Sequence, residues 1–197
     1  MADLKKTSRA RAALLLAASI AVAALAAGLI VMLRPADTAF TLPAVEADVA
    51  KRFQEVAQIS TDDLTAKMKT EKPPMLFDVR EDAEYRVSHL SGAERVDPGL
   101  ATADFLARYA LSAVGRDVVF YCSVGMRSSG LAAEVQEGLV KAGALSVSNL
   151  RGGLFGWHNE RRPLVDTSGP TDGVHPYNAK WGTLIDRQAE VRMQPAQ

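Results

Sequence analysis

Four consecutive apolar residues, Val118 to Tyr121, constrain most strongly how this chain can fold. A strand with one solvated face alternates apolar and polar residues, whereas a strand of a parallel sheet is buried on both faces and is apolar throughout. Further strands are predicted at Met75–Asp78, Ala93–Val96 and Ser146–Leu150. Because parallel strands are joined by helical crossovers, the sequence predicts an α/β domain with a mainly parallel central sheet and helices on both faces.

Helical segments alternate with these strands. Ser60 offers a capping oxygen to the helix that follows it, and Pro73-Pro74 ends that helix because proline has no amide hydrogen to donate. Gly143 is placed to end a later helix in the left-handed conformation. The spacing of apolar residues predicts helices over residues 44–58, 81–88, 104–110 and 128–142.

Composition excludes several classes of function. The 197 residues carry 23 basic and 23 acidic side chains, and no long basic stripe follows the first few residues, so no nucleic-acid partner is expected. A single cysteine rules out a disulfide within the chain and any cysteine-rich zinc site. The three histidines, His89, His158 and His175, lie far apart and show no metal-ligand spacing. We therefore predict no metal and no other cofactor.

The N-terminal region differs from the rest of the chain. Residues 12–33 contain no charge, and as a helix they would span roughly 33 Å, close to a hydrocarbon core of about 30 Å. Basic residues are concentrated before this stretch, and only Arg34 follows it closely. The positive-inside rule then places residues 1–11 in the cytoplasm. We expect a single-pass protein of the cytoplasmic membrane with its main domain on the periplasmic, extracytoplasmic side.

A cleaved signal peptide is the alternative for the same stretch. Small-x-small cleavage sites occur at Ala21–Ala23 and Ala24–Ala26. Cleavage there would leave the apolar residues 28–33 exposed to water, which favours a retained anchor.

Three further segments follow the apolar stretch. Residues 34–57 are interpreted as a juxtamembrane linker and helix, residues 58–162 as the main domain, and residues 163–197 as a C-terminal extension. The extension is rich in proline and polar residues and is either a disordered tail or a segment strapped across the domain. Its aromatic residues Tyr177 and Trp181 favour the second interpretation, and we expect both to be buried against the domain.

The only cysteine, Cys122, follows the predicted strand that ends at Tyr121. Ligands of open parallel sheets bind beyond the carboxyl ends of the strands, and Cys122 is placed there. The loop after it leads into a helix, whose N-terminus and backbone amides would acidify a thiol. Gly125 permits a left-handed turn, and Arg127 can bind an oxyanion. On position alone, a small buried hydrophobic residue is an equally good interpretation of Cys122.

Several blocks of sequence resemble the rhodanese family of sulfurtransferases, specifically its single-domain members. The resemblance covers roughly Ile59 to Arg162, and a second copy of the domain, as in tandem rhodaneses, is absent from this sequence. The blocks are DVR at 78–80 with EY at 84–85 and HLSGA at 89–93, CSVGMRS at 122–128, and LRGG at 150–153 with Trp157.

The resemblance implies that Cys122 takes a sulfane sulfur from a donor such as thiosulfate or a persulfide. The resulting persulfide would be stabilised by the loop amides and would pass its sulfur to a thiophilic acceptor, either cyanide or a thiol, including a protein thiol. Asp78 and Arg80 are expected to brace the loop rather than contact substrate. The residues expected to bind substrate are Ser123, Val124, Gly125, Met126, Arg127 and Ser128.

The loop also separates competing functions. Phosphatases and arsenate reductases of this fold have one residue more between cysteine and arginine, so the shorter loop here favours transfer of a single sulfur atom. Ser123 and Val124 stand where thiosulfate-using members commonly carry a basic residue, which leaves the physiological donor open. With one cysteine in the chain, the acceptor must be another molecule. A membrane-tethered binding or sensing module with little turnover is the alternative function.

Overall fold

The computed structural model describes residues 40–195 of the 197-residue chain. The predicted membrane segment, residues 12–33, and the basic residues 1–11 lie outside that range. Within residues 40–195, every helix is too short or too polar to cross a bilayer.

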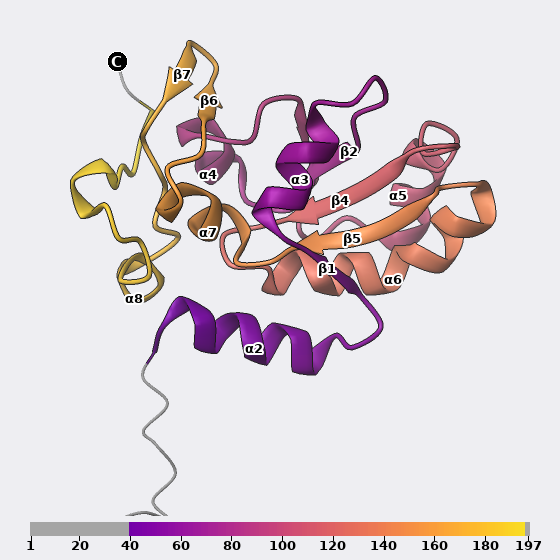
Figure 1. The fold of residues 1–197 in the computed structure, drawn as a ribbon, viewed down its shortest axis with the longest axis horizontal. Coiled ribbons are helices and arrows are strands. Elements are labelled where there is room, and N and C mark those ends of the chain that lie inside the picture. The colour runs from indigo at the N-terminus through magenta and orange to yellow at the C-terminus, as the bar shows by residue number, and fades with distance from the viewer. Residues whose placement is uncertain (1–39, 196–197) are drawn as a thin grey trace, which may run out of the picture. The chain divides into compact units, whose positions relative to one another are not determined.

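A five-stranded parallel sheet forms the centre of the domain (Figure 1). Its strands are β1 (Ala57–Ile59), β2 (Met75–Asp78), β3 (Ala93–Arg95), β4 (Asp117–Tyr121) and β5 (Ser146–Leu150). Every neighbouring pair runs parallel, in the order β1-β5-β4-β2-β3. The predicted parallel sheet is confirmed, and the consecutive apolar residues of β4 are explained because β4 is central and buried on both faces.

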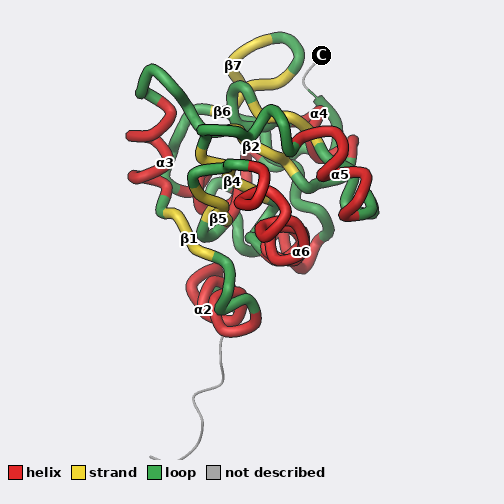
Figure 2. Tube along the Cα trace, turned by 90° about the vertical axis from the view of Figure 1, so that its right-hand side faces the viewer, coloured by secondary structure: helices red, strands yellow, loops and turns green. Residues whose placement is uncertain are grey.

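Helices cover both faces of the sheet. They are α2 (Leu42–Arg52), α3 (Thr61–Met68), α4 (Asp82–Val87), α5 (Thr102–Tyr109), α6 (Met126–Ala142) and α7 (Gly153–Asn159). Val118 and Phe120 of β4 pack with apolar residues of α5 and α6, whereas Val119 and Tyr121 pack with those of α3 and α7. Figure 2 shows α3 on one side of the strands and α5 and α6 on the other.

The predicted helix over residues 44–58 is wrong at its C-terminal end. α2 ends at Arg52, because Phe53 leaves the helical conformation with φ −122° and ψ 58°. Residues 57–59 instead form β1, whose backbone pairs with β5. Strand pairing has overridden the helical spacing here, because the same apolar residues reach the core from an extended chain.

The helix boundaries predicted from capping residues agree with the structure. The Asp63 amide donates to Ser60 Oγ (3.1 Å) at the start of α3. Gly143 ends α6 with a φ of 111°. Capping depends on neighbours in the sequence, which is why it was predictable.

The C-terminal extension is folded onto the domain. It contains an antiparallel hairpin of β6 (Leu164–Asp166) and β7 (Gly169–Thr171), followed by α8 (Ala179–Gly182). Figure 1 shows these elements at the end of the sheet toward which the arrowheads of β4 and β5 point. Four aliphatic residues of the extension are buried: Leu164, Val174, Leu184 and Ile185. The strapped interpretation is therefore correct over residues 163–195.

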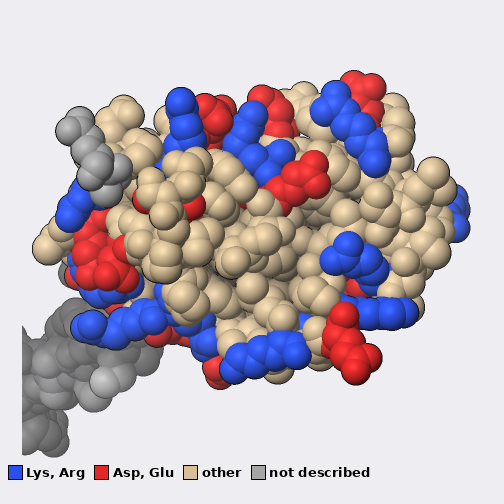
Figure 3. Space-filling view, turned by 90° about the horizontal axis from the view of Figure 1, so that it is seen from above, with Lys and Arg blue, Asp and Glu red and all other residues tan. Residues whose placement is uncertain are grey.

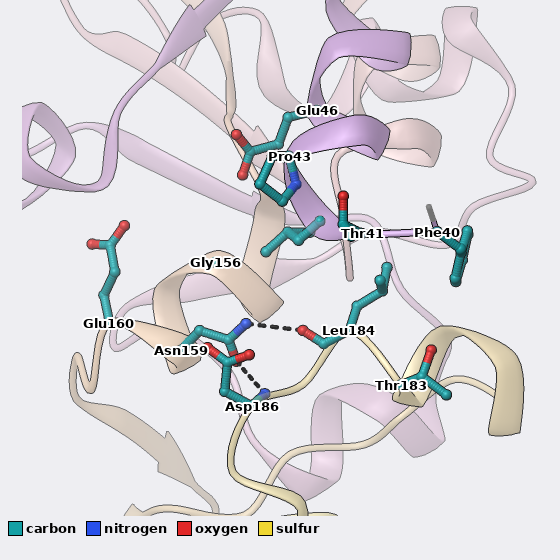
Figure 4. Close-up of a pocket in the computed structure, with 11 residues that line it drawn as sticks. Phe40, Thr41, Pro43, Glu46, Gly156, Asn159, Glu160, Thr183, Leu184 and Asp186 are labelled. Atoms are coloured by element: carbon teal, nitrogen blue, oxygen red, sulfur yellow. Dashed lines mark hydrogen bonds between the residues drawn. The ribbon is translucent and has the colours of Figure 1, made fainter. Parts of the chain in front are cut away.

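Asn159 at the end of α7 ties the extension in place. Its Nδ2 donates to the Leu184 carbonyl (2.9 Å), and its Oδ1 accepts from the Asp186 amide (2.9 Å) (Figure 4). A cavity of about 370 Å³ lies between this segment, α7 and the first residues of α2. Both polar groups of the Asn159 side chain are satisfied, so the extension is held by specific bonds as well as by apolar packing.

Charged residues of both signs are distributed over the surface. In the view from above, Lys and Arg are interspersed with Asp and Glu, and no sign dominates that face (Figure 3). This distribution matches the balanced composition of 23 basic and 23 acidic residues.

Replacing a buried residue of the extension should destabilise the whole domain. Ile185 is 1% exposed, and we expect Ile185→Ala to lower the free energy of unfolding by about 2–4 kcal/mol. Met193 in the same segment is 58% exposed, and Met193→Ala should change the free energy of unfolding by less than about 0.5 kcal/mol. Urea unfolding followed by tryptophan fluorescence measures both values. Equal values for the two variants would show that the extension does not fold with the sheet.

Candidate active site

Cys122 lies directly after β4, at the carboxyl end of the sheet, and is 1% exposed. The chain turns through Ser123 and Val124 to Gly125, which adopts a φ of 96° and directs its amide at the sulfur (3.2 Å). A Cβ at Gly125 would meet the Asn149 side chain at 2.9 Å. Glycine is therefore required at this position both for its backbone conformation and for space.

The first turn of α7 holds this loop. The amide of Leu154 donates to the Cys122 carbonyl (2.8 Å), and the amide of Phe155 donates to the Ser123 carbonyl (2.9 Å). The amides at the start of a helix have no partner within it, so the loop carbonyls satisfy them. Gly153 permits this approach, because a Cβ there would lie 2.4 Å from the Cys122 carbonyl oxygen.

Ser128 of α6 and Asn149 of β5 form a hydrogen-bond network beside the loop. Ser128, in the first turn of α6, donates its hydroxyl hydrogen to Asn149 Oδ1 (2.6 Å). Asn149 Nδ2 donates in turn to the Leu150 carbonyl (3.1 Å) and to Gln58 (2.8 Å). Sequence reasoning did not single out Asn149. A polar residue inside a strand predicted to be buried was the available signal, since such a group needs partners.

Arg127 is paired with a buried carboxylate that the sequence analysis did not assign. Its guanidinium donates to both oxygens of Glu84 at 2.8 and 2.9 Å and to Ser123 Oγ at 3.0 Å. Ser123 Oγ donates to Glu84 at 2.7 Å, which closes the network. Burial alone raises the pKa of Glu84, but the bonds from Arg127 and Ser123 outweigh it, so the pKa of Glu84 lies below its ordinary value.

The C-terminal extension forms one wall of the site. The ring centroid of Tyr177 lies 4.8 Å from Cζ of Arg127. Together with Trp181 and the loop, Tyr177 lines a cavity of about 170 Å³ over Cys122. Trp181 is partly buried and packs against the core, so the prediction of its burial is confirmed in part. The same prediction is wrong for Tyr177, which is 46% exposed. The Tyr177 ring covers a charged group rather than apolar surface.

Asp78 and Arg80 form a fully buried ion pair away from the cavity. Arg80 Nε and Nη2 donate to the two oxygens of Asp78 at 2.8 and 2.6 Å, and Nη2 also donates to the Ser88 carbonyl at 2.6 Å. Asp78 ends β2, the neighbour of β4, and the next residue, Val79, donates its amide to the Tyr121 carbonyl (2.8 Å). The pair therefore lies beside the strand that carries Cys122 and does not line the cavity.

The surroundings of Cys122 favour its thiolate. Burial raises the pKa of the Cys122 thiol, but the charge of Arg127 and the backbone amides of Ser128 and Val124 together bring it below its ordinary value. The N-terminus of the 17-residue helix α6 adds partial positive charge at the same point. A thiolate is the nucleophilic form of cysteine, so the site is arranged for attack by sulfur. Within residues 40–195, no cluster of His, Cys, Asp and Glu is suited to hold a metal ion.

Comparison with protein families gives one clear match. The model of the rhodanese-like domain matches residues 60–160, just over half of the chain. This chain belongs to the rhodanese-like domain family. The matched range contains Cys122, its loop and the first turn of α7, and it ends before Tyr177 and Trp181.

Relatives of this rhodanese-like chain are distant. A probable adenylyltransferase/sulfurtransferase MoeZ of Mycobacterium tuberculosis is 28% identical over 120 residues, which is 60% of this chain and 29% of the relative's length. A rhodanese-like domain protein from Staphylococcus aureus is 27% identical, with a TM-score of 0.41 over 52% of this chain and 91% of that one. A thiosulfate sulfurtransferase from Pseudomonas aeruginosa is 18% identical, with a TM-score of 0.46 over 62% of this chain and 23% of that one.

The acidity of Cys122 should depend on Arg127. Removing this positive charge in Arg127→Gln should raise the pKa of the thiol, so that less thiolate is present at neutral pH. The ultraviolet absorbance of the thiolate reports its titration, because Cys122 is the only cysteine.

Arg116 provides the matched control. It precedes β4, at the opposite end of the strand from Cys122, and its half-buried side chain donates to the Pro73 carbonyl (2.9 Å). Arg116→Gln should leave the titration of Cys122 unchanged. Identical curves for Arg127→Gln and the wild type would show that Arg127 does not stabilise the thiolate.

Proposed function

We propose that this protein is a sulfurtransferase of the rhodanese type, which carries a sulfane sulfur as a persulfide on Cys122. The observation that carries the proposal is a buried thiol of lowered pKa that faces a small cavity and is contacted by the Gly125 amide and the Arg127 charge. Such a group is a nucleophile prepared for a soft, compact electrophile such as divalent sulfur.

The first half-reaction is a displacement at sulfur. The Cys122 thiolate attacks the outer sulfur of a donor, a new S–S bond forms, and the old one breaks with its electron pair leaving on the departing group. With thiosulfate that group is sulfite, and with a persulfide it is a thiolate. The amides of Val124, Gly125 and Ser128 are placed to stabilise negative charge near the sulfur before and after transfer.

The second half-reaction regenerates the free thiolate of Cys122. A thiol or cyanide attacks the outer sulfur, and the electron pair returns to Cys122, which leaves as a stabilised thiolate. A low thiol pKa favours this step because a weaker base is a better leaving group. No other cysteine exists in the 197 residues, so the acceptor is a separate molecule, small or protein-borne.

A binding or sensing module with little turnover is the second candidate. The half-exposed Tyr177 and the small cavity favour it, because an aromatic side chain at the mouth of a site also suits a docking partner. In that case Cys122 would hold or report a sulfur species rather than cycle.

Intact mass measurement of the protein after incubation with donors separates the two candidates. We expect thiosulfate, a polysulfide or a small persulfide to add the mass of one sulfur atom, cyanide to remove it as thiocyanate, and Cys122→Ser to show neither change. A folded, reduced protein that either gains no sulfur from any donor or keeps the gained sulfur in the presence of cyanide would favour the binding module.

We also propose a location for the domain, the outer face of the cytoplasmic membrane, with residues 12–33 as its anchor. It is supported by the length of this uncharged stretch and by the basic residues before it. We expect the full chain to sediment with membranes and a chain starting at Asp37 to stay in the supernatant. Protease added to spheroplasts should digest the anchored domain, and full protection in intact spheroplasts would contradict the outward orientation.

A further inference from the structure

The cavity over Cys122 is small and has walls from two distant parts of the chain. Its volume is about 170 Å³, and its walls are residues 122–124, 126 and 127 of the loop together with Tyr177 and Trp181. Pockets for drug-sized ligands measure roughly 300–1,000 Å³, so only a small donor or the end of a larger one fits here. Val124 and Met126 complete a wall that is apolar and aromatic apart from Ser123, Arg127 and the sulfur.

Arg127 is the one basic residue among those lining this cavity, and it already has partners. Glu84 accepts from both of its terminal nitrogens, and the Tyr177 ring lies over its guanidinium carbon at 4.8 Å. The formal charges cancel within the Glu84–Arg127 pair and within the Asp78–Arg80 pair. The negative charge of the Cys122 thiolate therefore has no unpaired cationic side chain to balance it among the residues that line the cavity. A dianion such as thiosulfate is repelled by that charge, whereas a persulfide reacts in its protonated form, which is uncharged and is not repelled.

The backbone of Tyr177 is strained in a way that the core does not require. Its φ is 63°, a left-handed conformation that favours glycine, although its side chain is 46% exposed. The turn is locked because the Tyr177 amide donates to His175 Nδ1 (3.0 Å) and the Asn178 amide donates to the Pro176 carbonyl (2.8 Å). Strain at a half-exposed residue that covers a reactive site indicates a functional constraint.

Trp181, which lines the same cavity as Tyr177, is also held by specific contacts. The backbone amide of Trp181 donates to Asn178 Oδ1 (3.1 Å) as part of the cap of α8. Its ring meets the ring of Phe40 edge to face, with centroids 5.1 Å apart. The extension thus presents two fixed aromatic rings to the cavity.

We propose that Tyr177 and Trp181 are specificity-determining residues, which select a sulfane sulfur carried by a small uncharged thiol, as its persulfide, over thiosulfate. The aromatic wall accepts the organic part of such a donor, and the Tyr177 ring keeps Arg127 from binding a sulfonate group. This inference rests on the proposed sulfurtransferase function and names the donor class of that same site.

The transfer balances without an oxidant or reductant. A donor R–S–SH reacts with the Cys122 thiolate to give Cys122–S–SH and R–S⁻. One S–S bond forms, one breaks, and the electron pair of the broken bond leaves on R–S⁻. The proton remains on the transferred sulfur until the new persulfide ionises beside Arg127.

The test compares two donors, thiosulfate and hydroxyethyl persulfide, the persulfide of 2-mercaptoethanol. Rates of sulfur loading on the full chain are measured by intact mass, and each is divided by the rate of N-acetylcysteine with the same donor. The corrected rate of the wild type should be higher for hydroxyethyl persulfide by at least about tenfold, the size of effect expected from one unfavourable charge interaction near a protein surface.

Two variants should largely abolish this preference. Tyr177→Gly uncovers Arg127 and relieves the left-handed strain, and Met126→Lys adds an unpaired cation to the cavity wall. Each should lower the ratio of persulfide to thiosulfate rates by about tenfold. Tyr177→Phe keeps the ring over Arg127 and should keep the wild-type ratio.

Arg161→Gly is the matched control for backbone strain. Arg161 also has a left-handed backbone (φ 57°) but does not line the cavity. Its replacement by glycine relieves the same kind of backbone strain and should leave the donor ratio unchanged. A wild type that loads from thiosulfate as readily as from hydroxyethyl persulfide would overturn the selectivity, as would an unchanged ratio in both Tyr177→Gly and Met126→Lys. A wild type that loads from neither donor would overturn the sulfurtransferase function itself.

Discussion

Two hydrogen bonds from the first turn of α7 to the carbonyls of Cys122 and Ser123 determine the geometry of this end of the molecule. They turn these peptide groups toward α7, which leaves the following amides free to face the sulfur, as the amide of Gly125 does. The approach is so close that only glycine fits at Gly153. Bonds that satisfy the start of one helix therefore also shape the loop before another.

A second constraint is electrostatic and follows from burial. A cysteine that is 1% exposed would normally be a poor acid, because a buried thiolate loses its hydration. Arg127 and the amides at the start of α6 reverse that preference. The guanidinium in turn has its own buried partner, Glu84, which holds it beside the sulfur in a fixed orientation. The site thus combines an acidified thiol with very little free positive charge.

The C-terminal extension lies outside the family match but contributes to both the core and the cavity. The family match ends at residue 160, yet the extension supplies buried core residues and the two rings that close the cavity over Cys122. A domain cut at that boundary would keep the nucleophile and lose the wall above it. The matched region carries Cys122 and its loop, and the extension adds Tyr177 and Trp181 to the cavity that Cys122 lines.

The sequence by itself determined the α/β class, the parallel sheet, the caps at Ser60 and Gly143 and the position of Cys122 at a strand end. These features depend on residues close together in the chain, where periodicity and local hydrogen bonding act directly. The partnership of Arg127 with Glu84, the support of Ser128 by Asn149 and the placement of Tyr177 were decided only by the tertiary structure. Each joins residues more than 20 positions apart, and a side chain's partner at that distance depends on how the elements pack, which no local pattern encodes.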